Sequence, residues 1–192
     1  MTSIALGGGF SSPPEQAARA FRAVLESVSR PGTLQSVSGA QPPAPLSIAA
    51  GMVLLTLADG TTPLHLAGEV DCPPVRDWIT FHIGAPLVGA GQAMFAVGRW
   101  QDLLPVERFH QGDPDYPDRA ATLIVLMNDL TNAGATLTGP GIKTVAQLSL
   151  PEIDAFQRNA GQFPLGLDFI FTAGDRVAAL PRSTKVEGAP CM

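Results

Sequence analysis

The stretch Phe163–Glu187, FPLGLDFIFTAGDRVAALPRSTKVE, ends in residue types that can bind phosphate. Arg182 carries a guanidinium that can hold an oxyanion through two parallel hydrogen bonds, and the hydroxyls of Ser183 and Thr184 can add further donors. The preceding residues read as two apolar strands joined by a turn at 173–175, which would bring this group to a strand end. Strand ends also carry such residues simply because water solvates them. The residue types alone leave both interpretations open.

Two other motifs look like ligand sites but fail on spacing. GPGIKT, residues 139–144, resembles the end of a phosphate-binding P-loop, yet Ile142 stands where that loop needs glycine before its lysine. A tight turn between two strands is favoured there over an anion nest. HQGDPDYPD, residues 110–118, resembles the start of a calcium loop but lacks the turn glycine and the terminal glutamate. A solvated loop is the better interpretation.

The histidines and cysteines give no clear catalytic or metal-binding pattern. His65 and His82 lie in apolar surroundings, where a hydrogen-bonded structural histidine is commoner than a base or a ligand. Cys72 and Cys191 form no CxxC motif and have no neighbouring histidine pair. We therefore expect no metal site and two reduced cysteines.

Composition limits the class of protein. The chain has 192 residues, of which 45% are hydrophobic and 15% charged, so one domain spanning residues 1–192 can bury a sizeable core. A formal charge of -5, with only 12 Lys and Arg residues, argues against nucleic-acid binding. Because no signal peptide and no membrane-spanning apolar run is evident, we expect a cytoplasmic protein without membrane contact.

Helices dominate the first half of the chain. Ser12 and Glu15 form a capping-box pattern ahead of a helix that Arg30-Pro31-Gly32 ends, with Pro13 at its first position. One face of this helix is apolar and should pack on the body of the protein. Its residues are Ala17, Phe21, Val24, Leu25 and Val28.

The rest of the chain alternates helices and strands. LSIAAGMVLLTLADG, residues 46–60, is a buried helix or a buried strand, and its length favours a helix. Asp71 can cap a helix that opens on Pro73 and buries its apolar residues, namely Val75, Trp78 and Ile79. Strands follow at AMFAV, ATLIVLM, ATLTG and VAQLSL, then a helix over residues 151–161 and the final hairpin. In that hairpin Phe169, Phe171, Val177 and Leu180 should pack into the core. The order predicts an α/β fold with a mixed sheet covered by helices.

A set of ordered segments, including SRPG, VLLTLADGTTPLHL, FHIGAPLV, LTGPGI and the closing FPLGLDFIFTAGDRVAALPRST, resembles the PhnH family. Members of this family are subunits of the bacterial carbon–phosphorus lyase core complex, which acts in phosphonate catabolism. The resemblance covers nearly the whole chain, and its most specific part is the combination of FPLG.D with ALPR.T. The loop over residues 110–118 carries nothing diagnostic.

The resemblance implies a fold related to pyridoxal-phosphate transferases but without their active site. A pyridoxal enzyme needs a lysine for its Schiff base, and Lys143 and Lys185, the only lysines, lack a convincing pocket by sequence. No cysteine cluster is present for an iron–sulfur centre. No cofactor is therefore expected on this chain, and no catalytic residue is identified.

The resemblance further implies an accessory subunit, and a second hypothesis stays open beside it. In the first hypothesis the chain supports the transferase step that joins a phosphonate to the ribose C1 of ATP and releases adenine. This is the ribose 1-methylphosphonate 5-triphosphate synthase step. A radical iron–sulfur subunit with lyase activity then cleaves the carbon–phosphorus bond. The expected partners are the other complex subunits, including that radical subunit, and a second copy when the chain is alone, with one surface serving both pairings. The alternative is an autonomous enzyme of small phosphorylated substrates, with or without dependence on pyridoxal phosphate. Arg30, Arg182 and Thr184 are the candidate anion contacts, against ion pairing or simple solvation.

Overall fold

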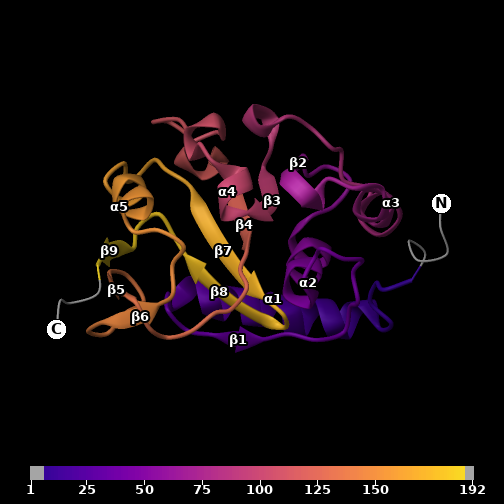
Figure 1. The fold of residues 1–192 in the computed structure, drawn as a ribbon, viewed down its shortest axis with the longest axis horizontal. Helices are drawn as coiled ribbons and strands as arrows, with labels where there is room; N and C mark the ends of the chain where they lie inside the picture. The colour runs from indigo at the N-terminus through magenta and orange to yellow at the C-terminus, as the bar shows by residue number, and fades with distance from the viewer. Residues whose placement is uncertain (1–6, 189–192) are drawn as a thin grey trace.

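A six-stranded mixed sheet forms the centre of the computed structural model, which describes residues 7–188 (Figure 1). Its strand order is β1-β8-β7-β4-β3-β2. The strands β7, β4, β3 and β2 run parallel, while β8 and β1 are antiparallel to their neighbours. The strands span Gln35–Ser36 (β1), Leu64–Leu66 (β2), Phe95–Arg99 (β3), Thr122–Leu126 (β4), Asp168–Ala173 (β7) and Arg176–Leu180 (β8). The α/β fold with a mixed sheet is confirmed.

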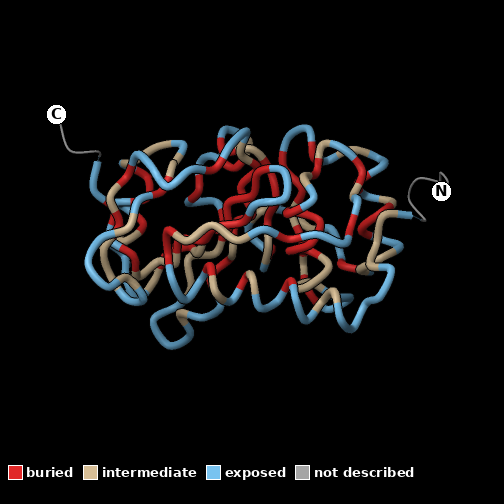
Figure 2. Tube along the Cα trace, turned by 90° about the horizontal axis from the view of Figure 1, so that it is seen from below, coloured by how far each residue is buried: buried red, intermediate tan, exposed pale blue. Residues whose placement is uncertain are grey.

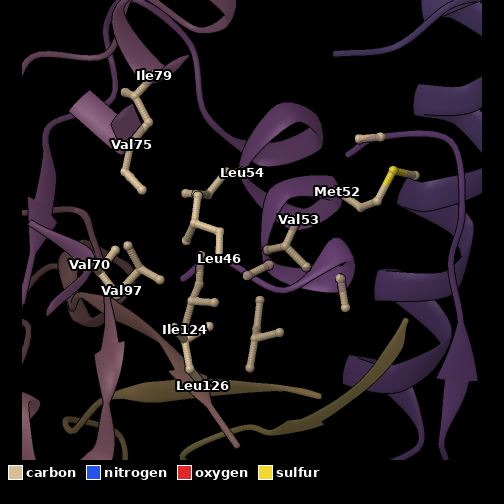
Figure 3. Packing of buried hydrophobic residues seen from close by; sticks show 14 of the residues in the cluster. Leu46, Met52, Val53, Leu54, Val70, Val75, Ile79, Val97, Ile124 and Leu126 are labelled. Atoms are coloured by element: carbon tan, nitrogen blue, oxygen red, sulfur yellow. The ribbon is translucent and has the colours of Figure 1, made fainter. Parts of the chain in front are cut away.

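Three helices cover one face of this sheet. They are α1 (Pro13–Ser29), α2 (Ile48–Leu57) and α3 (Pro73–His82). Because side chains alternate along a strand, Ile124 and Leu126 of β4 point toward these helices. Figure 3 shows them beside Met52, Val53 and Leu54 of α2. α2 is apolar all round because it lies in this core, which confirms the helical interpretation of residues 46–60.

The other face packs against α4 (Trp100–Leu103) and α5 (Asp154–Ala160). Trp100 stacks on Phe156 with ring centres 4.8 Å apart, and Phe156 meets Phe169 edge to face at 4.9 Å. Such aromatic pairs contribute about 0.5–1.5 kcal/mol each beyond the apolar area they bury. The predicted packing residues of the final hairpin, Phe169, Phe171, Val177 and Leu180, are all buried.

A second, three-stranded sheet lies beside α5, on the left of Figure 1. Its order is β6-β5-β9, with β5 at Ala135–Thr138, β6 at Ala146–Leu148 and β9 at Lys185–Glu187. Gln157 of α5 donates a side-chain hydrogen bond to the Val186 carbonyl at 3.0 Å, which ties the helix to this sheet. The GPGIKT segment connects β5 to β6, as the turn interpretation predicted. Short 3-10 turns complete the described chain at Gly68–Val70, Ala90–Gln92, Val106–Arg108 and Pro117–Arg119.

The helices begin at Pro13 and Pro73 as predicted, with Ser12 at the N-cap of the first, but the two predicted side-chain caps are wrong. The Ser12 side chain makes no capping bond, and the Gln16 side chain instead accepts from the Ser12 backbone N–H at 2.8 Å, because glutamine one turn into the helix reaches that amide. At α3 the capping position is Cys72. The Asp71 carboxylate turns to the guanidinium of Arg76, with Nη2–Oδ2 at 2.7 Å, because a charged partner gives the stronger hydrogen bonds.

The apolar residues of α1 divide between two faces, so the predicted single packing face is only partly right. Val24 is buried against the body of the protein together with Ala20, whereas Phe21, Leu25 and Val28 are 50%, 53% and 39% exposed. Figure 2 shows buried residues along the middle of the molecule and exposed residues on its outer turns. α1 therefore presents a second apolar stripe to its surroundings. Among the described residues no helix is both long and apolar enough to cross a membrane.

Candidate functional site

The side chain of Arg182, just after β8, is held inside the protein. Its Nη2 lies 2.5 Å from Oδ2 of Asp168 and its Nε lies 3.2 Å from Oδ1, while its backbone N–H donates to the same Oδ1 at 2.8 Å. Nη1 donates to the carbonyl of Pro117 at 2.5 Å. Only 13% of the Arg182 side chain is exposed. Most of its donors are thus already used within the chain, which favours an internal ion pair over contact with a bound anion.

This ion pair joins three segments that are distant in sequence. Asp168 begins β7 and is paired in register with Thr122, the first residue of β4. Pro117 belongs to the loop that leads into β4. Arg182 therefore connects the start of β7, the end of β8 and the loop over residues 110–121, and it fixes that loop beside the first residues of the central strands β4 and β7.

Thr184 is buried, being only 1% exposed. Its backbone N–H donates to the Pro181 carbonyl at 2.9 Å, but no partner in the described part of the chain lies within hydrogen-bonding distance of its Oγ1. Gly139, with a φ of +136°, packs against this segment so closely that an added Cβ would lie 3.1 Å from the Ser183 carbonyl oxygen. Glycine permits that approach and that φ.

Arg30 lies on the other side of the same glycine turn. A Cβ added to Gly141, whose φ is +80°, would lie 1.9 Å from the carbonyl oxygen of Ser29, so the turn packs against the end of α1. Nη1 of Arg30 lies 2.8 Å from Oε1 of Glu26, and 65% of the arginine side chain is exposed. The structure thus brings the Arg30 and Thr184 segments to one turn and directs Arg182 to Asp168. An anion contact at Arg30, Arg182 and Thr184 stays a prediction.

Residues 8–187 match the family model described as bacterial phosphonate metabolism protein (PhnH). The chain belongs to the PhnH family. The matched range includes both sheets and all helices of the described structure, so membership rests on the whole fold and not on one motif.

Two curated relatives agree with this PhnH assignment. The alpha-D-ribose 1-methylphosphonate 5-triphosphate synthase subunit PhnH of Rhizobium meliloti (strain 1021) is 36% identical over 189 residues, which cover 94% of each chain. The putative C-P lyase subunit protein HtxG of Stutzerimonas stutzeri is 28% identical over 187 residues, covering 92% of this chain and 88% of that protein.

Two histidines of this PhnH chain make hydrogen bonds to backbone carbonyls. Nδ1 of His65 donates to the Val88 carbonyl at 3.0 Å, and Nε2 of His82 donates to the Gly7 carbonyl at 2.9 Å, since a carbonyl can only accept. These bonds favour the structural interpretation of both rings. Within residues 7–188 no group of three His, Cys, Asp or Glu side chains is placed to hold a metal ion.

Two aspartates have a pKa below the ordinary value. The pKa of Asp59 is lowered by hydrogen bonds, first from the hydroxyl and backbone N–H of Thr61 and then from the hydroxyl of Thr62. The pKa of Asp71 is lowered chiefly by its hydrogen bonds with Arg76. The same contact raises the pKa of Arg76. In both cases the carboxylate form is stabilised by folding.

We expect these two aspartates to make stability depend on pH on the acid side. A carboxyl whose folded pKa is depressed contributes stability that is fully present above its unfolded pKa, about 3.9, and is lost as pH falls through the folded value. The thermal midpoint should therefore drop as pH falls from 6 to 3. Asp59→Asn and Asp71→Asn should each lower the midpoint at pH 6 and flatten this slope. Melting curves that keep the wild-type slope would contradict the assignment.

Sequence reasoning missed Asp168 as the partner of Arg182. The two residues are 14 positions apart, on neighbouring antiparallel strands or just beyond them, and they meet because Phe169 pairs with Leu180. A hairpin register counted from the turn at Gly174 would have placed Asp168 near Arg182. The contact with the Pro117 carbonyl carries no sequence signal, because a backbone oxygen is present at every residue.

Proposed function

We propose that this PhnH chain is an accessory subunit of the carbon–phosphorus lyase core complex. In this role it supports transfer of a phosphonate to the ribose C1 of ATP, with release of adenine, and is not catalytic alone. The observation that carries the proposal is the 36% identity, over nearly the whole of both chains, to a relative named as a subunit of that synthase. We also propose that the chain acts in the cytoplasm and that its fold is related to that of pyridoxal-phosphate transferases. The proposed lack of their active site is supported by the exposure of Lys143 and Lys185, because neither lysine lies in a pocket that could enclose a Schiff base.

The outer face of α1 supports an assembly role. Phe21, Leu25 and Val28 recur at helical spacing, so their exposed side chains form one stripe along the helix. Contiguous exposed apolar surface of this kind is characteristic of interaction sites. We propose that a second copy of the chain covers this stripe when the subunit is alone, with the two α1 helices antiparallel about a twofold axis.

The charges of α1 lie more than about 110° around the helix from the stripe, on the other flank of its exposed side, and they are complementary to themselves in that arrangement. Glu15 lies as far before the midpoint between Arg22 and Ala23 as Arg30 lies after it. Arg19 and Glu26 are related in the same way. An antiparallel pair centred there places Glu15 opposite Arg30 of the second copy and Arg19 opposite Glu26, each twice, which is the reciprocity that a twofold interface requires. When companion subunits are added, we propose that the radical subunit takes over this surface and the self-pair dissociates.

Reconstitution tests the proposed function. The pure chain incubated with ATP and methylphosphonate should leave adenine attached to ribose, whereas the companion subunits plus this chain should release it, and their activity should fall at least about tenfold when this chain is omitted. Chromatographic measurement of free adenine gives the readout. Adenine release by the pure chain, or full release by the companions without it, would overturn the proposal.

A further inference from the structure

A cavity of about 420 Å³ opens between the turn before β3 and the loop that precedes β4. Its wall consists of Gly91, Gln92, Ala93, Met94, His110 and Arg119. The side chain of Met94 is 53% exposed, whereas Ala93 is buried. This volume falls in the range of small-molecule sites. The wall is mainly apolar, with a guanidinium and an imidazole as its ionisable groups.

The guanidinium of Arg119 stacks on an aromatic ring. Its central carbon lies 4.0 Å from the centre of the Tyr116 ring, which is the stacked geometry of a cation–π contact. In the described part of the chain Arg119 forms no ion pair with a carboxylate. Stacking occupies the face of the guanidinium and leaves its N–H edge available to an oxyanion.

His110 supplies a second donor. The backbone N–H of Gly112 donates to Nδ1 of His110 at 3.1 Å, so Nδ1 carries no proton and the ring proton lies on Nε2. Nε2 is 3.7 Å from Oδ2 of Asp113, which is too long for a hydrogen bond. The N–H of His110 thus remains available to a ligand.

The loop that carries both residues is anchored at several points. The Ala121 N–H donates to the His110 carbonyl at 2.8 Å, and Gly166 N–H donates to the Gln111 carbonyl at 2.9 Å. Arg182 holds the Pro117 carbonyl. The ion pair between Arg182 and Asp168 therefore positions this loop, and a site fixed before binding loses less free energy to ordering when the ligand arrives.

We propose that this cavity binds a small organic anion that carries one oxyanion group and an apolar body. The oxyanion accepts from Arg119 and His110, and the apolar body packs on Ala93 and Met94. Exposed carboxylates at residues 113, 115 and 118 lie in the same loop without lining the cavity, and that of Asp113 is 3.7 Å from Nε2 of His110. Because repulsion grows with the charge of the ligand, their field disfavours a polyanion such as a nucleoside triphosphate more than a ligand with one oxyanion group. The inference goes beyond the assembly role and does not depend on it.

Isothermal titration of the full chain with phenylphosphonate tests the site. We expect phenylphosphonate to bind saturably. Benzyl alcohol and inorganic phosphate should bind more weakly than phenylphosphonate, because each lacks one half of the ligand, and ATP should also bind more weakly. Arg119→Gln should lower the affinity about ten- to hundredfold, as expected for loss of a charge-assisted hydrogen bond. Arg176→Gln is the matched control, because it removes the same charge from an exposed residue at the far end of β8 and should leave affinity unchanged.

The outcomes separate clearly. The proposal is overturned if phenylphosphonate does not bind saturably, or if ATP binds more tightly than phenylphosphonate. It is also overturned if Arg119→Gln binds phenylphosphonate as tightly as the wild type, or if Arg176→Gln loses as much affinity as Arg119→Gln. Arg182→Gln gives a second test of loop positioning, since its affinity should fall although Arg182 does not line the cavity. Neither result bears on adenine release, so failure here leaves the proposed subunit role intact.

Discussion

Asp168→Asn should lower the free energy of unfolding by about 3 kcal/mol, which is the usual cost of removing one partner from a largely buried ion pair. Asp168 accepts three hydrogen bonds from Arg182, and the guanidinium would keep its charge with little access to water, since 13% of its side chain is exposed. Urea denaturation followed by circular dichroism measures the change. Glu69→Gln is the control, because its pair with Arg99 is exposed and should contribute less than about 1 kcal/mol.

A double-mutant cycle sharpens this prediction. Arg182→Met alone should be destabilising because it removes the guanidinium donors from the Asp168 carboxylate and from the Pro117 carbonyl, and the Asp168 charge loses its partner. The Asp168→Asn/Arg182→Met double variant should be less destabilised than the sum of the single variants, since neither charge is then unpaired. Additive losses would show that the pair is not coupled in the folded protein, and would remove the argument that it anchors the loop over residues 110–121.

Helices and the central hairpin could be predicted because their signals are local. The proline at the start of α1, the length of the apolar run in α2, and the turn residues between β7 and β8 all act within a few positions along the chain. The resemblance to PhnH likewise depended on ordered local segments. The family model that matches residues 8–187 confirms it.

The parts that sequence could not supply depend on contacts between distant residues. β9 pairs with β5 across about 50 positions of the sequence, and both strands are too short for their residue patterns to predict this pairing. The helical period showed that α1 is amphipathic, yet it could not show that Val24 faces the core and Phe21 faces outward, because both are apolar. For the candidate anion site the same limit applied, since the residue type of Arg182 was compatible with phosphate while its position beside Asp168 was set by hairpin register.

The outward stripe of α1 leads to the other large expected effect, on self-association. Phe21→Asp should raise the dissociation constant of the homodimer at least about hundredfold, because a half-exposed aromatic at the centre of an interface commonly contributes 2 kcal/mol or more and the twofold axis repeats the change. Sedimentation velocity over a concentration series measures it. Phe81→Asp on α3 is the matched control, since Phe81 is also 50% exposed and lies outside the stripe. Equal weakening by both variants would contradict the assignment of the face.

Charge reversal tests the orientation of the two helices. Glu15→Lys should weaken the homodimer by placing a lysine opposite Arg30 of the second copy, and Arg30→Glu in the same chain should restore part of the affinity. Within one chain these residues are 15 positions apart, about 22 Å along a helix, which is beyond the screening length of about 8 Å in physiological salt. Restoration therefore cannot arise inside one subunit and must act across the antiparallel pair. A double variant that dissociates further than Glu15→Lys alone would exclude this geometry, and a dimer indifferent to both changes would place the interface elsewhere.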